Sequence, residues 1–182
     1  ALGHGLAGRV ALDGVLRGSA DHPAGEFELR GEKLGFGALR VDAAEGRGRL
    51  AEGRNGAIAV KVGLTGLGLA DEREARVRSA AFVFEGSRAA NTAHLEALGR
   101  GANSVRIELA GALSDGPRWE GRLTALETRG DYPATLVAPA PLLLSADAVR
   151  LGAAELRGGA GGRFRFDDTR WQARHLVARG SV

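Results

Sequence analysis

The residue types that support catalysis or metal binding occur in this chain, but their spacing does not form a recognisable site. Four histidines are spread through 182 residues: His4, His22, His94 and His175. They lack the i, i+4 spacing and the neighbouring carboxylates of common metal sites. The pairs Asp21-His22 and Asp167-Asp168 are typical of turns. We therefore expect neither a metal site nor a catalytic acid–base pair.

Glycine-rich segments and serines also fail to match the motifs of known catalytic chemistry. The segments GEKLGFG (31–37) and GGAGG (158–162) lack the Gly-Lys-Ser/Thr ending and the following helix of a phosphate-binding loop. We predict that both are turns. No serine lies in a G-x-S-x-G nucleophile elbow. An enzyme is thus the least supported class of function, and we expect no cofactor.

The composition is that of a folded soluble protein, with 44% hydrophobic and 26% charged residues. The formal net charge is only +3, and the arginines alternate with acidic residues instead of forming a patch. Aromatic residues, at 5%, are too few for a base-stacking surface. These features argue against nucleic-acid binding. Because cysteine is absent, disulfides and thiolate metal sites are excluded.

The longest apolar stretch, residues 132–149, is interrupted by Pro133, Pro139 and Pro141. It is too broken for a membrane-spanning helix. The chain begins at Ala1 without a signal peptide, so we expect an excerpt of a longer protein. Within the excerpt, residues 1–182 are expected to form a single domain.

Positioning elements are indicated by apolar and charged residues that alternate with a period of two. In 105–113, Val105, Ile107 and Leu109 share one face, opposite charged residues. After the turn formers 114–117, Trp119, Leu123 and Ala125 are predicted to share a face in the same way. Two strands joined by a turn, each with an apolar and a charged face, form a β-hairpin.

The same alternation recurs in five further segments, which predicts an all-β, antiparallel fold. The segments are 8–18, 25–31, 38–43, 57–66 and 161–168. Three others, 71–82, 91–99 and 145–156, fit either a helix or a strand. We favour strands for all three, with a bulge near Ala80-Ala81 and at most one short helix.

An antiparallel sheet with one apolar face must bury that face. The chain offers no helix of adequate length to cover it. The sheet must then close into a sandwich or barrel, or curl into a trough with room for a guest. Composition alone does not separate these alternatives.

An ordered series of segments in residues 86–180 resembles a known family. The series comprises Gly86-Ser87, NTAHLEA, VRIELAG, WEGRLTAL, LVAPAPLLLS and VRLGAAELRG. It is similar to a middle segment of the TamB family, the inner-membrane subunit of the translocation and assembly module. That family is grouped with AsmA-like, bridge-like lipid transfer proteins.

The resemblance implies a long curled sheet, or β-taco, with a hydrophobic concave face. It also implies a periplasmic location, a tether to the inner membrane in the full-length protein, and a TamA-like outer-membrane partner bound through regions outside this chain. The implied function is phospholipid transport between the two membranes during outer-membrane biogenesis. Two alternatives stay open: a scaffold for assembly of outer-membrane β-barrels or autotransporters, and a self-packed envelope binding module.

Under this interpretation, the alternating apolar positions line a groove that contacts phospholipid acyl chains. The candidate lining residues are Val10, Leu12, Leu16, Phe27, Leu29, Ile58, Val60, Val62, Leu64, Val105, Ile107, Leu109, Leu123, Phe164 and Phe166. Trp119 and Trp171 fit either the lip of the groove or a core cluster beside a turn, and the second is favoured. His94 is expected on the polar face.

Overall fold

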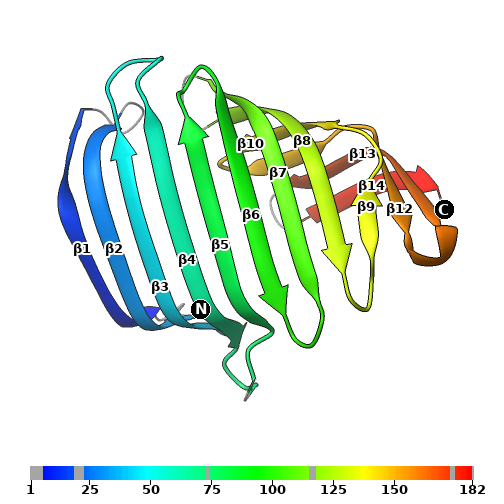
Figure 1. Cartoon of the computed structure of the whole chain (residues 1–182), viewed down its shortest axis with the longest axis horizontal. Coiled ribbons are helices and arrows are strands. Elements are labelled where there is room, and N and C mark those ends of the chain that lie inside the picture. Colours follow the sequence, from blue (N-terminus) through cyan, green and yellow to red (C-terminus); the bar gives the residue numbers. More distant parts are fainter. Residues whose placement is uncertain (1–5, 19–22, 73, 115–117, 173–174, 182) are drawn as a thin grey trace.

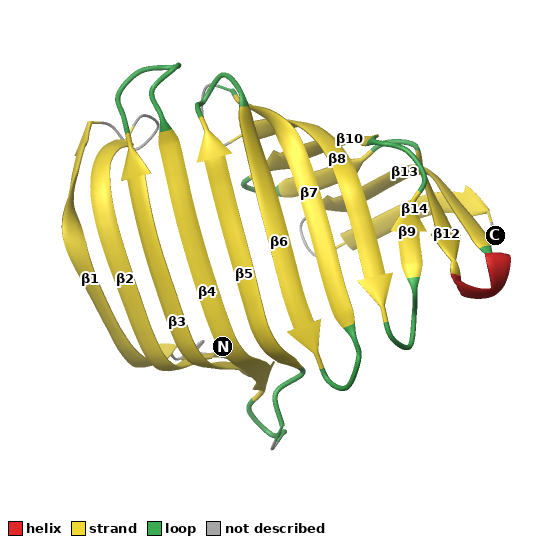
Figure 2. Cartoon of the chain, viewed as in Figure 1, coloured by secondary structure: helices red, strands yellow, loops and turns green. Residues whose placement is uncertain are grey.

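The computed structural model describes residues 6–18, 23–72, 74–114, 118–172 and 175–181. His4, Asp21, His22 and most of the predicted turn 114–117 lie outside these residues. The predicted all-β, antiparallel fold is confirmed, because the described residues form one fourteen-stranded sheet and a single 3₁₀ turn, Gly159–Gly161 (Figures 1 and 2).

The first eight strands follow one another in both sequence and space. They are β1 (Leu6–Gly18), β2 (Pro23–Phe36), β3 (Leu39–Leu50), β4 (Ile58–Leu69), β5 (Val77–Gly86), β6 (Asn91–Gly99), β7 (Ser104–Leu113) and β8 (Arg118–Arg129). The remaining strands are β9 (Ala134–Leu136), β10 (Ala140–Ser145), β11 (Ala148–Leu151), β12 (Ala154–Gly158), β13 (Arg163–Gln172) and β14 (His175–Ser181). The strand assignment is therefore confirmed for 91–99, and in the other two segments for 77–82, 148–151 and 154–156. The described residues of 71–76 lie between β4 and β5.

After β8 the sheet has a branched appearance, because β8 and β13 each pair with two shorter strands on one side. Two interrupted strands produce this arrangement. β8 pairs with β10 through Leu123 and Ala140 and with β9 through Glu127 and Thr135, so the register differs by one residue. β13 likewise pairs with both β11 and β12. Taken as one strand each, β9–β10 and β11–β12 reduce the fourteen strands to a simple twelve-strand meander.

A line of irregular backbone crosses the first five strands near their lower ends. Gly8 has a φ of 109°, Lys33 of 51° and Gly66 of 68°. The pairing places these residues in neighbouring positions, followed by Arg78, where the β5–β6 register shifts. Bulges and left-handed residues bend strands, and the lower ends of β1–β3 turn sharply in Figure 1.

A second line of interruptions crosses the C-terminal strands. It begins in β8, where Thr124 and Ala125 together oppose Glu108. It continues through the breaks at 137–139 and 152–153 and ends at Asp167, beside the register shift between β13 and β14. This line allows the sheet to curl, so that β10, β13 and β14 lie behind the main sheet in Figure 1.

Four local predictions from the sequence are corrected by these bends. GEKLGFG (31–37) is not a turn, because Lys33 adopts a left-handed conformation and β2 continues to Phe36. Asp167-Asp168 lies within β13, at a bulge. The β5 bulge is at Arg78 and not at Ala80-Ala81. Ala125 opposes Glu108 on the charged face, because Thr124 is an extra residue in β8.

Arg88, in the turn between β5 and β6, joins the upper ends of several strands. Its side chain is 7% exposed. One guanidinium nitrogen donates to the carbonyl oxygens of Ala51 (3.3 Å) and Gly53 (3.2 Å), and the other donates to that of Pro23 (2.7 Å). The Arg88 carbonyl oxygen also accepts a bond from the backbone of Leu113. Arg88 thus holds the β2, β3–β4 and β7 ends in one arrangement.

We expect Arg88→Ala to lower the free energy of unfolding by about 2–4 kcal/mol, because the charge-assisted bonds from the buried guanidinium to three carbonyl oxygens are lost. Arg88→Lys keeps the charge but not the planar fork, so its loss should be intermediate. Urea denaturation measures both. Surface substitutions usually change the free energy of unfolding by no more than about 0.5 kcal/mol. An Arg88→Ala variant whose free energy of unfolding changes no more than that would show that Arg88 does not hold the strand ends together.

Candidate functional site: the inner face of the curled sheet

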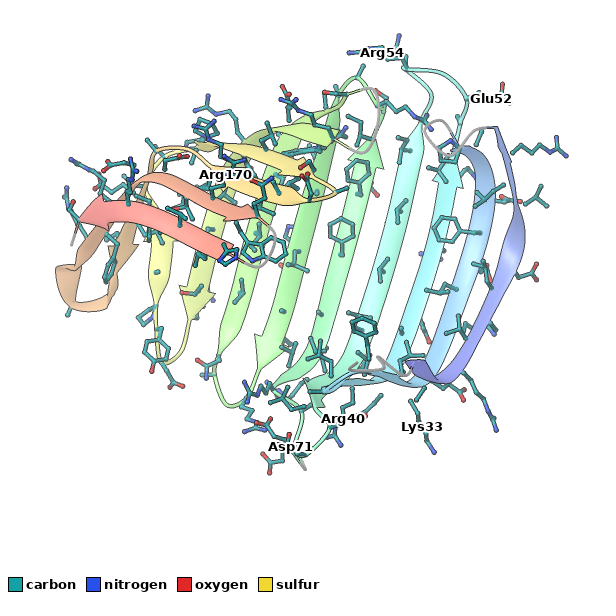
Figure 3. All side chains as sticks on the ribbon, turned by 180° about the vertical axis from the view of Figure 1, so that it is seen from behind. Lys33, Arg40, Glu52, Arg54, Asp71 and Arg170 are labelled. Carbon is teal, nitrogen blue, oxygen red and sulfur yellow. The ribbon has the colours of Figure 1, made fainter. Side chains whose placement is uncertain are left out.

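The inner face of the sheet is identified by contacts between strands that are not neighbours. Ile107 of β7 and Phe166 of β13 pack against the same buried cluster. The cluster consists of Leu123, Leu136, Ala140 and Ala154. Strands so far apart in the meander meet only on the concave side of a curl. In Figure 3, which shows this side, β13 and β14 pass in front of the main sheet.

The register then carries this face across the whole sheet. A central row of in-register residues runs from β1 to β13: Leu12, Leu29, Gly46, Val62, Phe82, Leu95, Ile107, Leu126, Leu136, Leu156 and Phe164. Every member is apolar or glycine. The side chains of neighbouring members lie at cross-strand contact distance, so the row forms a continuous apolar stripe.

Three parallel rows lie beside it on the same face. One contains Gly14, Phe27, Gly48, Val60, Phe84, Ala93, Leu109, Leu123, Ala140, Ala154 and Phe166. A second contains Val10, Gly31, Ala44, Leu64, Ala80, Ala97, Val105, Thr128, Ala134 and Gly158. A third contains Leu16, Gly25, Leu50, Ile58, Gly86, Asn91, Gly111, Gly121, Leu142, Leu151, Thr169 and Ala178. None of these described residues is charged.

All fifteen candidate lining residues lie on these four rows, so the structure brings them to one face. Their burial differs along the sheet. Leu12 on β1 is 66% exposed, and Val10 and Leu16 are similarly open. Leu123 is buried in the closed part, where Ile107 and Leu109 pack against it. Whether these side chains contact lipid stays a prediction.

Nine large apolar residues of these rows were missed from the sequence: Leu50, Phe82, Phe84, Leu95, Leu126, Leu136, Leu142, Leu151 and Leu156. Phe82 and Phe84 stand in the central row and the row beside it, opposite Val62 and Val60. The alternation Phe82-Val83-Phe84 was the available signal, but the bulge was expected too close to it. Leu126 was missed because the extra residue Thr124 changes the parity of β8.

The two tryptophans have different environments. Trp119 is 6% exposed, and its Nε1 donates to Asn91 Oδ1 at 2.6 Å. The structural interpretation of Trp119 is therefore confirmed. Trp171, opposite Val149 on β11 and Leu176 on β14, is 48% exposed. An exposed amphipathic ring at the rim of an apolar face is what a groove lip requires.

Glycines on the inner face leave space above their backbone, and side chains from neighbouring strands occupy this space. A Cβ at Gly48 would lie 2.3 Å from the ring of Phe27. Cβ atoms at Gly111 and Gly121 would each lie 2.6 Å from the ring of Trp119. These aromatic rings therefore lie flat against the sheet instead of standing up into the trough. Flattened rings add apolar surface without filling the concave space.

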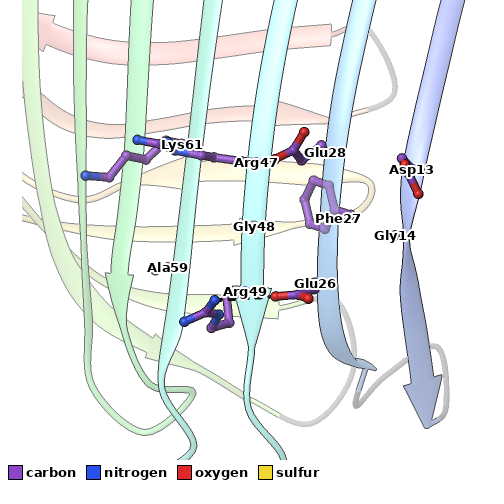
Figure 4. A pocket seen from close by; sticks show the side chains of 10 residues that line it. All are labelled: Asp13, Gly14, Glu26, Phe27, Glu28, Arg47, Gly48, Arg49, Ala59 and Lys61. Carbon is purple, nitrogen blue, oxygen red and sulfur yellow. Dashed lines mark hydrogen bonds and ion pairs between the residues drawn. The ribbon is translucent and has the colours of Figure 1, made fainter.

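The outer face carries matched charges in register. Glu26, Glu28 and Arg30 of β2 face Arg49, Arg47 and Glu45 of β3. Figure 4 shows a shallow pocket on this face, lined by Glu26, Glu28, Arg47, Arg49 and Lys61 among others. His94 lies here as predicted, with Nε2 at 3.1 Å from Glu96 and Nδ1 at 3.8 Å from Glu108. Elsewhere on the outer face like charges also stand opposite one another, as at Asp13 and Glu28 and at Arg47 and Lys61.

Shifted pKa values among the described residues occur at strand ends and on the outer face. A hydrogen bond from Arg76 lowers the pKa of Glu72 in the β4–β5 loop. Hydrogen bonding with Glu108 raises the pKa of Arg106, and the Ser145 hydroxyl lowers that of Asp147. Each shift favours the charged form, which is how ion pairs and turns behave. Figure 3 shows Glu52 and Arg54 at one end of the strands, and Lys33, Arg40 and Asp71 at the other.

Among the residues that the structure describes, no group of three or more histidine, cysteine, aspartate or glutamate side chains is arranged to hold a metal ion. No helix in the same residues has the length and apolar character needed to cross a membrane. The site that remains is an extended apolar surface, not a cluster of reactive groups.

We expect Gly48→Ala to lower the free energy of unfolding by about 1–3 kcal/mol, because Phe27 must leave its flat position. Gly63→Ala is the matched control, since Gly63 lies on the outer face of the neighbouring strand and has nothing within 4 Å of an added Cβ. This control should be neutral or stabilising by up to about 1 kcal/mol. Thermal and urea denaturation measure both variants, and equal effects would refute the role of Phe27.

Comparison with known families places this surface in context. The family model described as "TamB, N-terminal domain" matches residues 1–134. The match overlaps residues 86–134 of the series from which the resemblance was drawn. No curated protein and no solved structure gives a significant match to the chain.

Proposed function

The chain belongs to the TamB family, and from this premise we propose that its inner face is a hydrophobic conduit for phospholipid acyl chains. Family membership associates the chain with the cell envelope and the outer membrane. The family comprises non-enzymatic components of transport and assembly. The proposal adds the substrate, phospholipid, and the surface that carries it.

The observation that carries the proposal is the uncharged central row. A charged lining residue would have to be desolvated each time an apolar chain passed it. The described inner face avoids this cost from Leu12 on β1 to Phe164 on β13, although charged residues make up about a quarter of the chain. Charges are found instead on the outer face and at the strand ends.

The free-energy requirement is large enough to need such a lining. Exposing the two acyl chains of one phospholipid, about 30 methylenes, costs roughly 24 kcal/mol at about 0.8 kcal/mol per methylene. Valine, leucine, isoleucine and phenylalanine side chains replace the contact with water. The charged head group stays in solvent at the open side of the trough. No reactive group is required.

The open side of the trough favours a bound guest molecule and argues against an interior packed by the protein's own side chains. Among the described residues, no large side chain is fully buried, and the inner-face residues Val10, Leu12 and Leu16 of β1 are each more than half exposed. A self-packed sandwich would cover them with a second layer, whereas here one sheet curls on itself. In this proposal the conduit lies in the periplasm, and the full-length protein is tethered to the inner membrane. A TamA-like outer-membrane protein binds through regions outside this chain.

Assembly of outer-membrane β-strands is the second candidate function. It requires sheet edges that can pair with an incoming strand. Within the described residues, β1 pairs with β2, and β14 pairs with β13. The same lining would then hold the lipid-facing side chains of the client.

The occupant of the inner face is identified by photo-crosslinking from adjacent residues. A photoreactive amino acid at Leu29, in the central row, should capture phospholipid. The same group at Arg30, on the outer face, should capture little. Mass spectrometry of the adducts distinguishes lipid from peptide. Peptide at Leu29 would favour the assembly function, and equal lipid labelling at both positions would argue against a one-sided conduit.

The uncharged lining is tested by placing the same acid on each face. Val62→Asp puts a carboxylate in the central row, and Ala81→Asp puts one on the outer face of the neighbouring strand. We expect Val62→Asp to reduce the phospholipid extracted from the purified chain at least fivefold, and Ala81→Asp to leave it unchanged. Circular dichroism should show the same strand content in both. Equal lipid content would remove the basis for the proposal.

A further inference from the structure

Arg88 is a buried cation at the upper ends of the strands, and no described carboxylate neutralises it. The residue is only 7% exposed, and its three described side-chain hydrogen bonds all go to neutral carbonyl oxygens. None of the ion pairs among the described residues includes it. A buried charge is costly unless it is paired, and carbonyl dipoles replace only part of its lost hydration. An anion beside Arg88 would offset the remaining cost.

The guanidinium of Arg88 keeps donors for such an anion. An arginine side chain has five N–H groups. Nη1 donates two of them to Ala51 and Gly53, and Nη2 donates one to Pro23. The Nε–H and the second N–H of Nη2 have no acceptor among the described residues, and Nε is not fully covered. Two donors on one planar group match two oxygens of a phosphate.

This cation lies directly above the apolar lining. Its acceptor Ala51 follows Leu50, and Arg88 itself lies two residues after Gly86. Leu50 and Gly86 belong to the third parallel row of the inner face, where Ile58 stands between them. Ile58 is 4% exposed. The uncharged surface therefore begins immediately below the guanidinium.

The lower ends of β2–β5 differ, because the inner face stays apolar around the bend there. A Cβ added to Gly31 would lie 2.8 Å from the side chain of Leu34, so Leu34 lies on the inner face beyond the bend. Val41 on β3 opposes Leu34, and Leu67 and Val77 continue this row on β4 and β5. One end of the lining thus has a cation, and the other has a crease of aliphatic side chains.

We propose that Arg88 binds the phosphate group of a phospholipid whose acyl chains extend along the strands toward the lower bend. This inference rests on the proposed lipid conduit and adds the orientation of the guest in it. The lining has the required depth: from Ile58 in the third row to Leu64 in the second it extends about 20 Å, at roughly 3.3 Å per residue. The chains of one leaflet need about 15 Å, half of the hydrocarbon core of a bilayer.

NMR of the unmodified chain tests the contact through the Nε–H signal of Arg88, which is assigned by its absence in Arg88→Lys. We expect dioctanoyl phosphatidylglycerol to shift this signal. Dioctanoylglycerol, which has the same chains and no phosphate, should leave it unchanged. Glycerol phosphate, which lacks the chains, should shift it only at concentrations at least roughly a hundredfold higher, because apolar burial supplies most of the affinity. An equal response to glycerol phosphate would overturn the assignment to a lipid.

Isothermal titration calorimetry measures the binding of each lipid in the same samples, and it separates failure of this inference from failure of the conduit. Phospholipid that binds without shifting the Arg88 signal would refute the phosphate site alone. The same holds if dioctanoylglycerol shifts the signal as much as the phospholipid does. If neither lipid binds, the conduit and the phosphate site are both refuted.

Removal of the charge provides an independent measurement. Arg88→Gln keeps a planar polar group without the cation, and we expect it to weaken binding of dioctanoyl phosphatidylglycerol about tenfold or more. Binding of dioctanoylglycerol should be unchanged. Arg54→Gln is the matched control, since Arg54 is exposed in the β3–β4 loop at the same end of the strands (Figure 3). It should change either affinity by less than about twofold, because exposed charges contribute little. Equal weakening of both lipids by an Arg88→Gln variant with unchanged circular dichroism would overturn the proposal.

Discussion

The structure depends on the constraint that residues paired across an antiparallel sheet share a face. One slip of a single residue would exchange the two faces of a strand. Here such a slip would bring Arg106 and Glu108 of β7 to the inner face in place of Ile107. The bulges are tolerated because they are aligned: the extra Thr124 in β8 is followed by an interruption in each later strand up to β13. The inner face therefore turns a corner without losing its apolar character.

An open trough also requires that the side chains of its inner face do not fill the concave space. Large aromatic side chains are few, and Phe27 and Trp119 lie flat over glycines of neighbouring strands. Alanines of the middle strands, such as Ala93, have short side chains that extend little into the trough. The cost is the conformational freedom of glycine in the unfolded chain. An interior of this kind favours an extended guest over a compact core.

The fold class and the face of each candidate residue were predictable because strand alternation is a local property. All fifteen candidate lining residues share the inner face. The bends were not predictable, since a left-handed Lys33 and an extra Thr124 follow from pairing with distant strands. That is why GEKLGFG was mistaken for a turn and Leu126 was missed. The buried position of Arg88 had no local signal either, because its acceptors lie up to 65 residues away.

The two halves of the sheet divide stability and access between them. In β8–β13 the curl brings Leu123, Leu136 and Phe166 together, and apolar burial there stabilises the fold. In β1–β2 the same inner face stays open, so Leu12 gains little from folding and is held by the backbone ladder alone. A charge in the closed half would act mainly on folding, whereas one in the open half would act mainly on a guest. Lipid access and structural integrity are therefore separable within one continuous surface.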